Sequence, residues 1–411
     1  MKILFVTPMP PSPAARGAIP VLLHSQLLGL RRNHEVTLLT VAGPREAELE
    51  ALEALSDSGV EVHAVHRLTP RGLDRVRHRS RLLGQWLSSP WPKRTVWFYE
   101  PDIELMVNRL AAKRHFDLIA VEDSAMGVHR YPASIPALLT EHEVRRPREV
   151  NWKRLALTGG MAAFGELDWR RWRRYQFDTW SKFALLQVFT HLDAEAAAEI
   201  APGLRDRIRV NPYGVEIPEM LDFTSEEAGT IIFIGNFKHQ PNVDAALWLG
   251  KTIAPLVRTR LPNLRVTLVG LNAPRAVRGL TDGSIELLED VPDLRPLLAR
   301  TAVVVAPIRI GGGMRMKVLH AMAHAKPVVT TSRGAAGLDA TGSMPPVMLA
   351  DDATRFAEAT LLLLEDQTRR RSLGQAAREF VAANFSPQAH AERLEAVYSE
   401  LLQARKAADA A

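Results

Sequence analysis

Short apolar runs separated by longer amphipathic stretches follow one another along the whole chain. The runs are rich in Val, Ile and Leu and are apolar at successive positions, as in residues 3–7, 118–122, 266–270 and 302–307. A parallel strand that is covered by helices on both faces has this pattern, because neither face meets water. The runs form two sets along the chain. They predict an α/β protein with two doubly wound, Rossmann-like domains.

A proline-containing stretch without periodicity, residues 212–218, lies between the two sets, and a polar stretch follows it. This composition is typical of a linker. We therefore expect an N-terminal domain at 1–220 and a second domain at 221–385. A helix at 386–411 could pack back on the first domain. In such folds ligands bind beyond the carboxyl ends of the strands, so the chemistry should follow the apolar runs.

Composition narrows the class of protein only a little. The 411 residues include 52 Lys+Arg against 46 Asp+Glu, and the resulting net charge of +6 permits an anionic ligand or surface without requiring one. Because the chain has no cysteine, disulfides, thiolate nucleophiles and Cys-ligated zinc are excluded. No apolar run reaches the roughly 18 residues of a membrane-spanning helix, and the apolar start is too short for a signal peptide. We expect a cytoplasmic protein.

A glycine loop between an apolar run and an expected helix, within residues 307–323, is the clearest candidate for binding chemistry. Three glycines at 311–313 would let backbone amides approach an anion, and the helix start adds partial positive charge. Arg315 and Lys317 have the wrong sign for that helix end, which a bound diphosphate would explain. The alternative is a glycine turn with solvated cations. The loop fits neither Gly-x-Gly-x-x-Gly nor a P-loop, which disfavours hydride transfer and ATP hydrolysis.

Motifs along nearly the whole chain resemble those of family 4 glycosyltransferases, which have the GT-B fold of two facing Rossmann-like domains. The order and spacing of several segments carry the resemblance: 3–17, 209–216, 233–237, 241–244, 311–323 and 326–338. The loop is similar to that of a branch with a Gly-rich GGGxRxK motif. The resemblance implies hexosyl transfer from a nucleoside-diphosphate sugar to an acceptor hydroxyl, in glycan biosynthesis, with retained configuration and without metal or other cofactor.

The resemblance also implies a donor site in the second domain. Arg315 and Lys317 would neutralise the leaving diphosphate while the sugar carbon gains positive charge. His320 stands where many members carry the glutamate that binds the ribose, and an imidazole offers a single hydrogen bond there. His320 and His324 have metal-ligand spacing, but no third ligand is evident and no metal is expected. The other donor-binding candidates are Gly235, Asn236, Lys238, Gly311, Gly312, Gly313 and Met314, of which Lys238 could equally be a surface lysine.

Carboxylates and a histidine follow two apolar runs of the first domain. Glu122 stands where the family often has a functional histidine, and His142 follows the next run. Either could accept the acceptor's proton, which makes both catalytic candidates; the alternative is a role as strand-end caps and ion-pair partners. Asp123 and Gly17 are the expected acceptor-side residues.

Residues 145–182 combine basic side chains with Trp152, Trp169, Trp172 and Trp180. This combination suits peripheral contact with the inner face of a membrane, where a lipid-linked acceptor could be presented, but tryptophans packed inward explain it as well. A second basic run at 75–81 could lie on the same face. We expect a nucleotide sugar and a carbohydrate, lipid-linked or small-molecule acceptor as partners, and no nucleic acid. The alternatives are a non-catalytic nucleotide- or partner-binding relative, or a nucleotide-sugar epimerase on the same fold.

Overall fold

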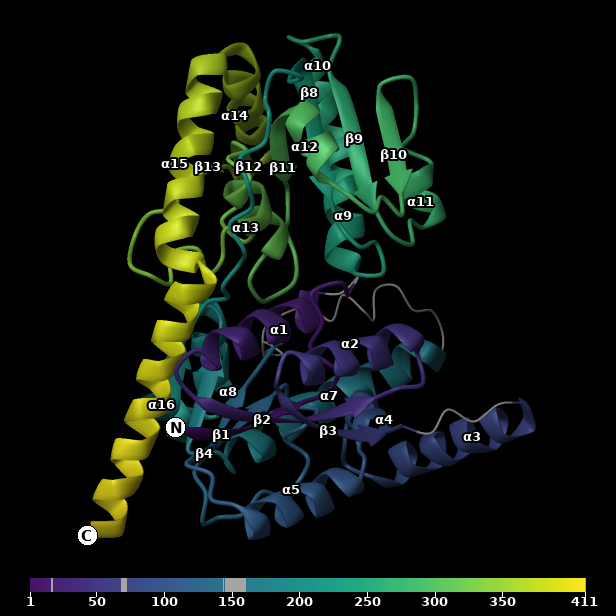
Figure 1. Ribbon diagram of the computed structural model, residues 1–411. Coiled ribbons are helices and arrows are strands. Elements are labelled where there is room, and N and C mark those ends of the chain that lie inside the picture. Colours follow the sequence, from purple (N-terminus) through teal and green to yellow (C-terminus); the bar gives the residue numbers. More distant parts are fainter. Residues whose placement is uncertain (16–17, 68–71, 143, 145–159, 411) are drawn as a thin grey trace. The chain divides into compact units, whose positions relative to one another are not determined.

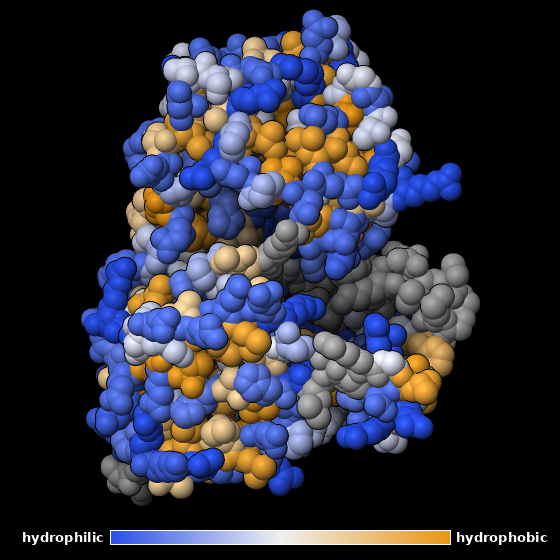
Figure 2. Space-filling model, turned by 45° about the vertical axis from the view of Figure 1, so that its right-hand side comes forward, coloured by the Kyte–Doolittle hydropathy of each residue, from blue (hydrophilic) through white to orange (hydrophobic). Residues whose placement is uncertain are grey.

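The computed structural model describes residues 1–410 except 16–17, 68–71, 143 and 145–159 (Figure 1). The chain divides into two compact units, of which the first is Met1–Gly214 with His390–Ala411 and the second is Val215–Ala389. The division falls a few residues before the boundary expected near residue 220. The visible surface is mostly hydrophilic with scattered hydrophobic patches, as is normal for a folded chain (Figure 2).

The first unit contains a seven-stranded parallel sheet among its described residues, in the order β3-β2-β1-β4-β5-β6-β7. The strands are β1 (Lys2–Thr7), β2 (Glu35–Ala42), β3 (Glu61–His66), β4 (Leu118–Glu122), β5 (Ala137–Thr140), β6 (Leu185–Val188) and β7 (Ile208–Val210). The helices are α1 (Ala18–Leu30), α2 (Glu46–Asp57), α3 (Gly72–Ser88), α4 (Lys93–Phe98), α5 (Asp102–Lys113), α7 (Gly160–Trp180), α8 (His191–Ile200), the 3₁₀ helix η1 (Pro202–Arg207) and α16 (Pro387–Ala410).

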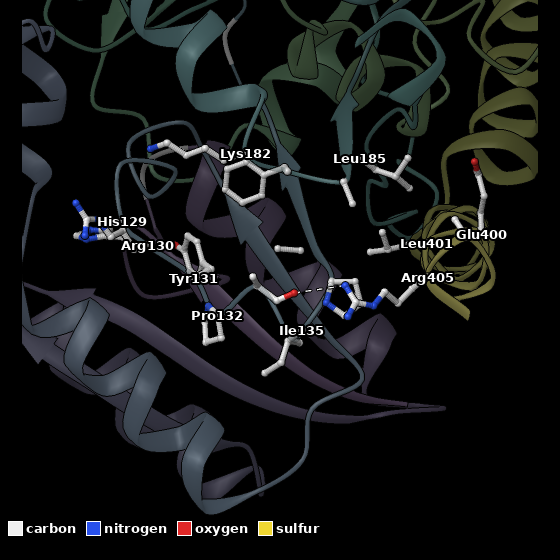
Figure 3. Close-up of a pocket in the computed structure, with 16 residues that line it drawn as sticks. His129, Arg130, Tyr131, Pro132, Ile135, Lys182, Leu185, Glu400, Leu401 and Arg405 are labelled. Atoms are coloured by element: carbon white, nitrogen blue, oxygen red, sulfur yellow. Dashed lines mark hydrogen bonds between the residues drawn. The ribbon is translucent and has the colours of Figure 1, made fainter. Parts of the chain in front are cut away.

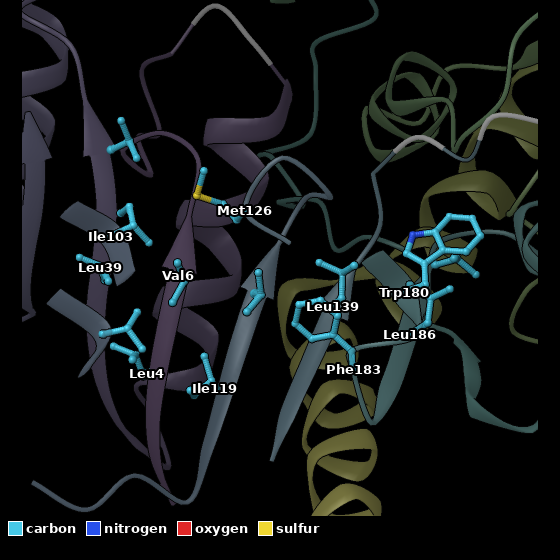
Figure 4. Close-up of a cluster of buried hydrophobic side chains, with 14 of the residues drawn as sticks. Leu4, Val6, Leu39, Ile103, Ile119, Met126, Leu139, Trp180, Phe183 and Leu186 are labelled. Carbon is cyan, nitrogen blue, oxygen red and sulfur yellow. The ribbon is translucent and has the colours of Figure 1, made fainter. Parts of the chain in front are cut away.

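Side chains from both faces of this sheet are buried. Leu4 and Val6 of β1 join one core cluster, which Figure 4 shows, whereas their neighbours Ile3 and Phe5 join a second cluster on the opposite face. The second cluster includes Tyr398 of α16, so the C-terminal helix covers part of that face. The alternation explains why the strands are apolar at consecutive positions.

The second unit contains a six-stranded parallel sheet among its described residues, in the order β10-β9-β8-β11-β12-β13. The strands are β8 (Glu227–Ile234), β9 (Arg265–Gly270), β10 (Ile285–Glu289), β11 (Thr301–Ala306), β12 (Val328–Thr330) and β13 (Met348–Leu349). The helices are α9 (Gln240–Trp248), the π-helical turn η2 (Leu249–Ile253), α10 (Ala254–Arg258), α11 (Arg275–Arg278), α12 (Arg295–Arg300), α13 (Met316–Ala323), α14 (Ala353–Glu365) and α15 (Gln367–Phe385).

Both units are doubly wound, which confirms the expected α/β fold class. In each sheet the strand order reverses once, at β1 and β4 in the first unit and at β8 and β11 in the second. Loops leave such a switch point in opposite directions and open a crevice at the carboxyl ends of the strands. The residues that follow β4, β8 and β11 therefore lie where each unit can bind a ligand.

Candidate functional site

In the second unit, glycines let the loops at the switch point approach one another closely. A Cβ atom at Gly270, at the end of β9, would lie 1.8 Å from the carbonyl oxygen of Gly235. A Cβ atom at Gly235 would lie 2.8 Å from Cγ of Asn242, near the start of α9. A larger residue would meet backbone at Gly270 and the Asn242 side chain at Gly235, so glycine allows the close approach at both positions. The loop after β8 is thus pressed against α9.

The glycine loop after β11 has a backbone that other residues rarely adopt. Gly311 has φ 91° and Gly313 has φ 76°, both in the left-handed region. A Cβ atom at Gly311 would also lie 2.8 Å from Cγ of Pro241. The carbonyl oxygen of Gly311 accepts a hydrogen bond of 3.1 Å from Arg333 Nη1. The loop therefore enters α13 in a defined conformation, with its glycines required by geometry.

Two cations lie at the start of α13. Arg315 is the N-cap residue of this helix, and its Nη2 donates to the carbonyl oxygen of Ile310 at 3.4 Å. Lys317 Nζ donates to Oδ1 of Asn242 at 2.5 Å and lies 4.6 Å from the centre of the Phe233 ring. Within the described residues no carboxylate forms an ion pair with Lys317. The helix end and both side chains concentrate positive charge at one place.

The electrostatics of Lys317 follow from this placement. Burial, together with the neighbouring charge of Arg315, lowers the pKa of Lys317 to about 7. The ammonium is half-buried, and no ion pair with a carboxylate balances its charge in the part of the chain that the structure describes. A bound anion would supply that counter-charge and would restore the proton to Lys317. The arrangement is suited to binding a phosphate or diphosphate.

Asn242 links the loop after β8 to the start of α13, a role that its position in the sequence does not reveal. Its Nδ2 donates to the carbonyl oxygen of Asn236 at 2.7 Å, while its Oδ1 accepts from Lys317. A second link joins α9 to the glycine loop, because Asp244 pairs with both nitrogens of the Arg309 fork at 2.7 and 3.1 Å. The Asn-x-Asp pattern that starts α9 was the available signal for both residues.

The remaining donor-side candidates have different surroundings. The Asn236 side chain accepts from the backbone N–H of Lys238, and Lys238 itself is exposed. Met314 is buried, so its side chain packs inside the second unit. Gly312 lies between the two left-handed glycines. His320 is exposed on α13, three residues after Lys317. No group of three or more metal-ligating side chains occurs in the part of the chain that the structure describes.

In the first unit, Glu122 and His142 come together at the carboxyl ends of β4 and β5. Glu122 is fully buried; its Oε1 accepts from Gln26 Nε2 and its Oε2 from His142 Nε2, both at 2.9 Å. Burial opposes the charge on His142, but the hydrogen bond to Glu122 and the charges of Glu122, Asp123 and Glu141 outweigh it and raise its pKa. His142 Nδ1 is buried and has no hydrogen-bond partner among the described residues.

Asp123 has both carboxylate oxygens engaged. Its backbone is left-handed, with φ 72°, and its Oδ2 lies 2.5 Å from Nη2 of Arg94. Its Oδ1 accepts from the backbone N–H of Ala125. Asp123 thus caps the end of β4 and pairs with Arg94. Gln26 and Arg94 carry no motif in the sequence that predicts a role, and they reach these carboxylates from helices α1 and α4. The other acceptor-side candidate, Gly17, lies outside the described residues.

The tryptophans of α7 are part of the core. Trp169, Trp172 and Trp180 are buried, and Trp180 Nε1 donates to Glu141 at 2.9 Å. Their inward packing removes the interfacial tryptophans as an argument for membrane contact through 145–182, of which 145–159, with Trp152, lie outside the described residues. No described helix is long and apolar enough to cross a membrane.

A cavity of about 620 Å³ lies at the opposite, amino-terminal ends of β5 and β6 (Figure 3). Tyr131, Phe183 and Leu185 line it, and Leu401 and Arg405 of α16 close one side. It contains none of the site residues expected from the sequence.

Comparisons with known proteins bear on these sites. Residues 228–366, about a third of the chain, match the family model described as Glycosyl transferases group 1. The lipopolysaccharide core biosynthesis mannosyltransferase LpcC of Rhizobium leguminosarum bv. viciae is 34% identical over 133 residues, 32% of this chain and 37% of that protein. An uncharacterized 44.6 kDa protein in the cps region of Klebsiella pneumoniae is 24% identical over 165 residues, 38% of this chain and 42% of that protein. The match thus spans about two fifths of these relatives.

Solved structures resemble the chain over nearly its full length. Sucrose-phosphate synthase from Thermosynechococcus elongatus has a TM-score of 0.66 at 16% identity and covers 98% of this chain and 100% of its own. Anabaena Alr3699/HepE in complex with UDP and glucose has a TM-score of 0.64 at 14% identity, covering 97% and 100%. At these identities the similarity shows the fold, which is the expected one of two Rossmann-like domains.

Proposed function

We propose that this protein is a glycosyltransferase that moves a sugar from a nucleoside diphosphate to an acceptor hydroxyl. One observation carries the proposal. Arg315 and Lys317 lie beside a glycine loop with left-handed backbone, at the switch point of a unit in which residues 228–366 match the glycosyl transferases group 1 model. The family match at 228–366 includes the glycine loop, both cations and Asn242.

The site would act by neutralising the negative charge of the leaving group. When the bond between sugar and phosphate breaks, negative charge grows on the leaving diphosphate and positive charge on the sugar carbon. Arg315 and Lys317 offset the negative charge, and amides of the glycine loop donate to phosphate oxygens. Because side chains and a helix end supply this positive charge, we propose transfer without a metal. Retention of configuration is proposed from the family resemblance.

On the side of the first unit, we assign the contact with sugar or acceptor to His142 and a positioning role to Glu122. Both carboxylate oxygens of Glu122 already accept hydrogen bonds, whereas His142 Nδ1 has no hydrogen-bond partner within the described residues. The raised pKa of His142 favours the protonated ring, which donates a hydrogen bond to a sugar or acceptor oxygen. Asp123 holds the strand end through Arg94.

The choice of donor is proposed from the relatives. The Rhizobium relative is named a mannosyltransferase, and the Anabaena structure holds UDP and glucose. We therefore propose a nucleotide-activated hexose as donor and a carbohydrate, lipid-linked or small-molecule acceptor in glycan assembly.

A thermal-shift screen of nucleoside diphosphates and their sugars tests the proposal. A ligand that binds the folded chain raises its melting temperature by an amount set by concentration over Kd. The parent should respond to one base, and Lys317→Ala should lose most of the response while Lys251→Ala, an exposed lysine of the same unit, keeps it. A donor that binds but is never transferred across an acceptor panel would favour a non-catalytic relative. Epimer formed without acceptor would favour an epimerase.

A further inference from the structure

Helix α3 is almost entirely exposed. Of its 17 residues only Trp86 is buried among the described part of the chain. Leu73 is 78% exposed, Val76 61%, Leu83 47% and Leu87 51%. Figure 1 shows α3 running out from the sheet of the first unit. An isolated helix of this length is marginal in water, so one with so little packing needs another surface to stabilise it.

The exposed apolar side chains share one face of α3. Leu73, Val76, Leu83 and Leu87 are separated by three, seven and four residues, which places them within one stripe of a helix. This arrangement is that of a helix that lies along an interface with its apolar stripe buried.

Arginines flank this stripe on both sides. Arg75 and Arg79, four residues apart, form one row, and Arg77 and Arg81 form the other. All four are exposed, and the single acid of the helix, Asp74, lies 3.6 Å from Arg77. An excess of arginines around an apolar stripe is complementary to a surface that is anionic at its edge and apolar beneath.

The carboxyl end of α3 is anchored to α7. Trp86 Nε1 donates to Asp168 Oδ1 at 3.0 Å, and the Arg171 guanidinium lies 5.1 Å from the Trp86 ring and donates to the Leu87 carbonyl oxygen. Phe164 of α7 is 53% exposed and lies 5.9 Å from the Trp86 ring. The stripe is thus held firmly by the first unit at one end.

We infer that α3 binds the surface of a bilayer that contains anionic phospholipid. Its apolar stripe enters the acyl boundary, and its four arginines contact lipid phosphates. The inference differs from a membrane contact through the tryptophans of α7, because those rings are buried. It does not depend on sugar transfer.

Vesicle flotation tests the inference with the full chain. The parent should float with vesicles of phosphatidylglycerol and phosphatidylcholine and not with phosphatidylcholine alone. The double variant Leu73→Ser/Val76→Ser should bind at least about tenfold more weakly, because two apolar side chains no longer enter the bilayer. Leu105→Ser is the matched control, since Leu105 is 67% exposed on α5 of the same unit. Each of Arg77→Gln and Arg81→Gln should weaken binding about fivefold, and the exposed Arg109→Gln should not.

A fluorescent probe reports insertion independently of affinity. The chain has no cysteine, so Val76→Cys gives a single labelling site for a polarity-sensitive dye. Its emission should shift to the blue on anionic vesicles, whereas the dye on Leu105→Cys should not respond. The inference is overturned by absence of flotation, by unchanged binding of the double serine variant, or by equal response of both dyes. It is also overturned if sedimentation shows a dimer that the double variant abolishes while vesicles bind neither protein, because a second copy then covers the stripe.

Discussion

The two switch points of this protein have the same strand topology, but their polar side chains differ in how far their hydrogen bonds and charges are already satisfied. At β4 in the first unit, Glu122 and Asp123 are buried and every carboxylate oxygen already has a partner. At β8 and β11 in the second unit, Arg315 and Lys317 are half-buried, and Lys317 has an amide oxygen as its partner.

This difference separates polar groups that stabilise the fold from groups that are available to a ligand. A buried carboxylate that loses its partners costs stability, so the network around Glu122 stabilises the fold. A half-buried cation that has no carboxylate partner at a glycine loop lowers the stability of the free protein. A bound anion would remove this cost, so such a cation indicates a binding site. We therefore propose that the second unit binds the anion, and that His142 Nδ1, which has no hydrogen-bond partner among the described residues, is the atom available to a ligand in the first.

The largest expected effect is loss of turnover on removing either cation. Arg315→Ala and Lys317→Ala should each reduce the rate of sugar transfer at least about ten- to a hundredfold, the range for losing one group that stabilises developing charge. Rates measured at saturating donor would check this, with Lys251→Ala as control. Turnover within twofold of the parent for both variants would refute their assignment.

The second effect concerns stability of the first unit. Glu122→Gln should lower the free energy of unfolding by about 2 kcal/mol, because the amide keeps one acceptor oxygen and turns its NH2 group toward the other buried donor. Urea unfolding followed by tryptophan fluorescence measures it, and Glu53→Gln, an exposed glutamate on α2, is the control. The affinity for nucleotide should stay unchanged. If that affinity fell together with the free energy of unfolding, the two switch points would not act independently.

The third effect is a pH dependence of nucleotide binding. With the pKa of Lys317 at about 7 in the free protein, a diphosphate that binds its protonated form raises that pKa and takes up a proton. Affinity should therefore fall as pH rises, by about fivefold between pH 7 and 8. Calorimetry in buffers of different ionisation enthalpy would detect the proton. Lys317→Gln should bind weakly and without this slope, and a slope that persists in it would assign the proton elsewhere.

The smallest effect is a pH dependence of stability at His142. Because its folded pKa is raised above the unfolded value near 6.5, the stabilisation is complete below about pH 6.5 and is lost as pH rises through the folded pKa. His142→Gln should thus lower the free energy of unfolding more at pH 6 than at pH 9, as urea unfolding at the two pH values would measure. His191→Gln, which changes an exposed histidine of the same unit, is the control. A larger loss at pH 9 would reverse the sign assigned to this pair.

The apolar runs and the glycine loop could be read from the sequence because their signals are local. Each expected strand has a counterpart in the structure, since a strand buried on both faces needs consecutive apolar residues wherever it lies. Gly311 and Gly313 likewise follow from the backbone of one short loop. Arg315 and Lys317 could be expected beside that loop because they start the helix that follows it.

Only the tertiary structure decided which side chains meet. Gln26 reaches Glu122 across 96 positions and Asn242 reaches Lys317 across 75, and no periodicity encodes such a pair. The tryptophans of α7 suggested an interface in the sequence and the leucines of α3 did not, yet these tryptophans are buried and the leucines are exposed. A helix's own sequence determines only which of its faces is apolar. Whether that face is buried depends on what packs against the helix, and the order of the strands decides this.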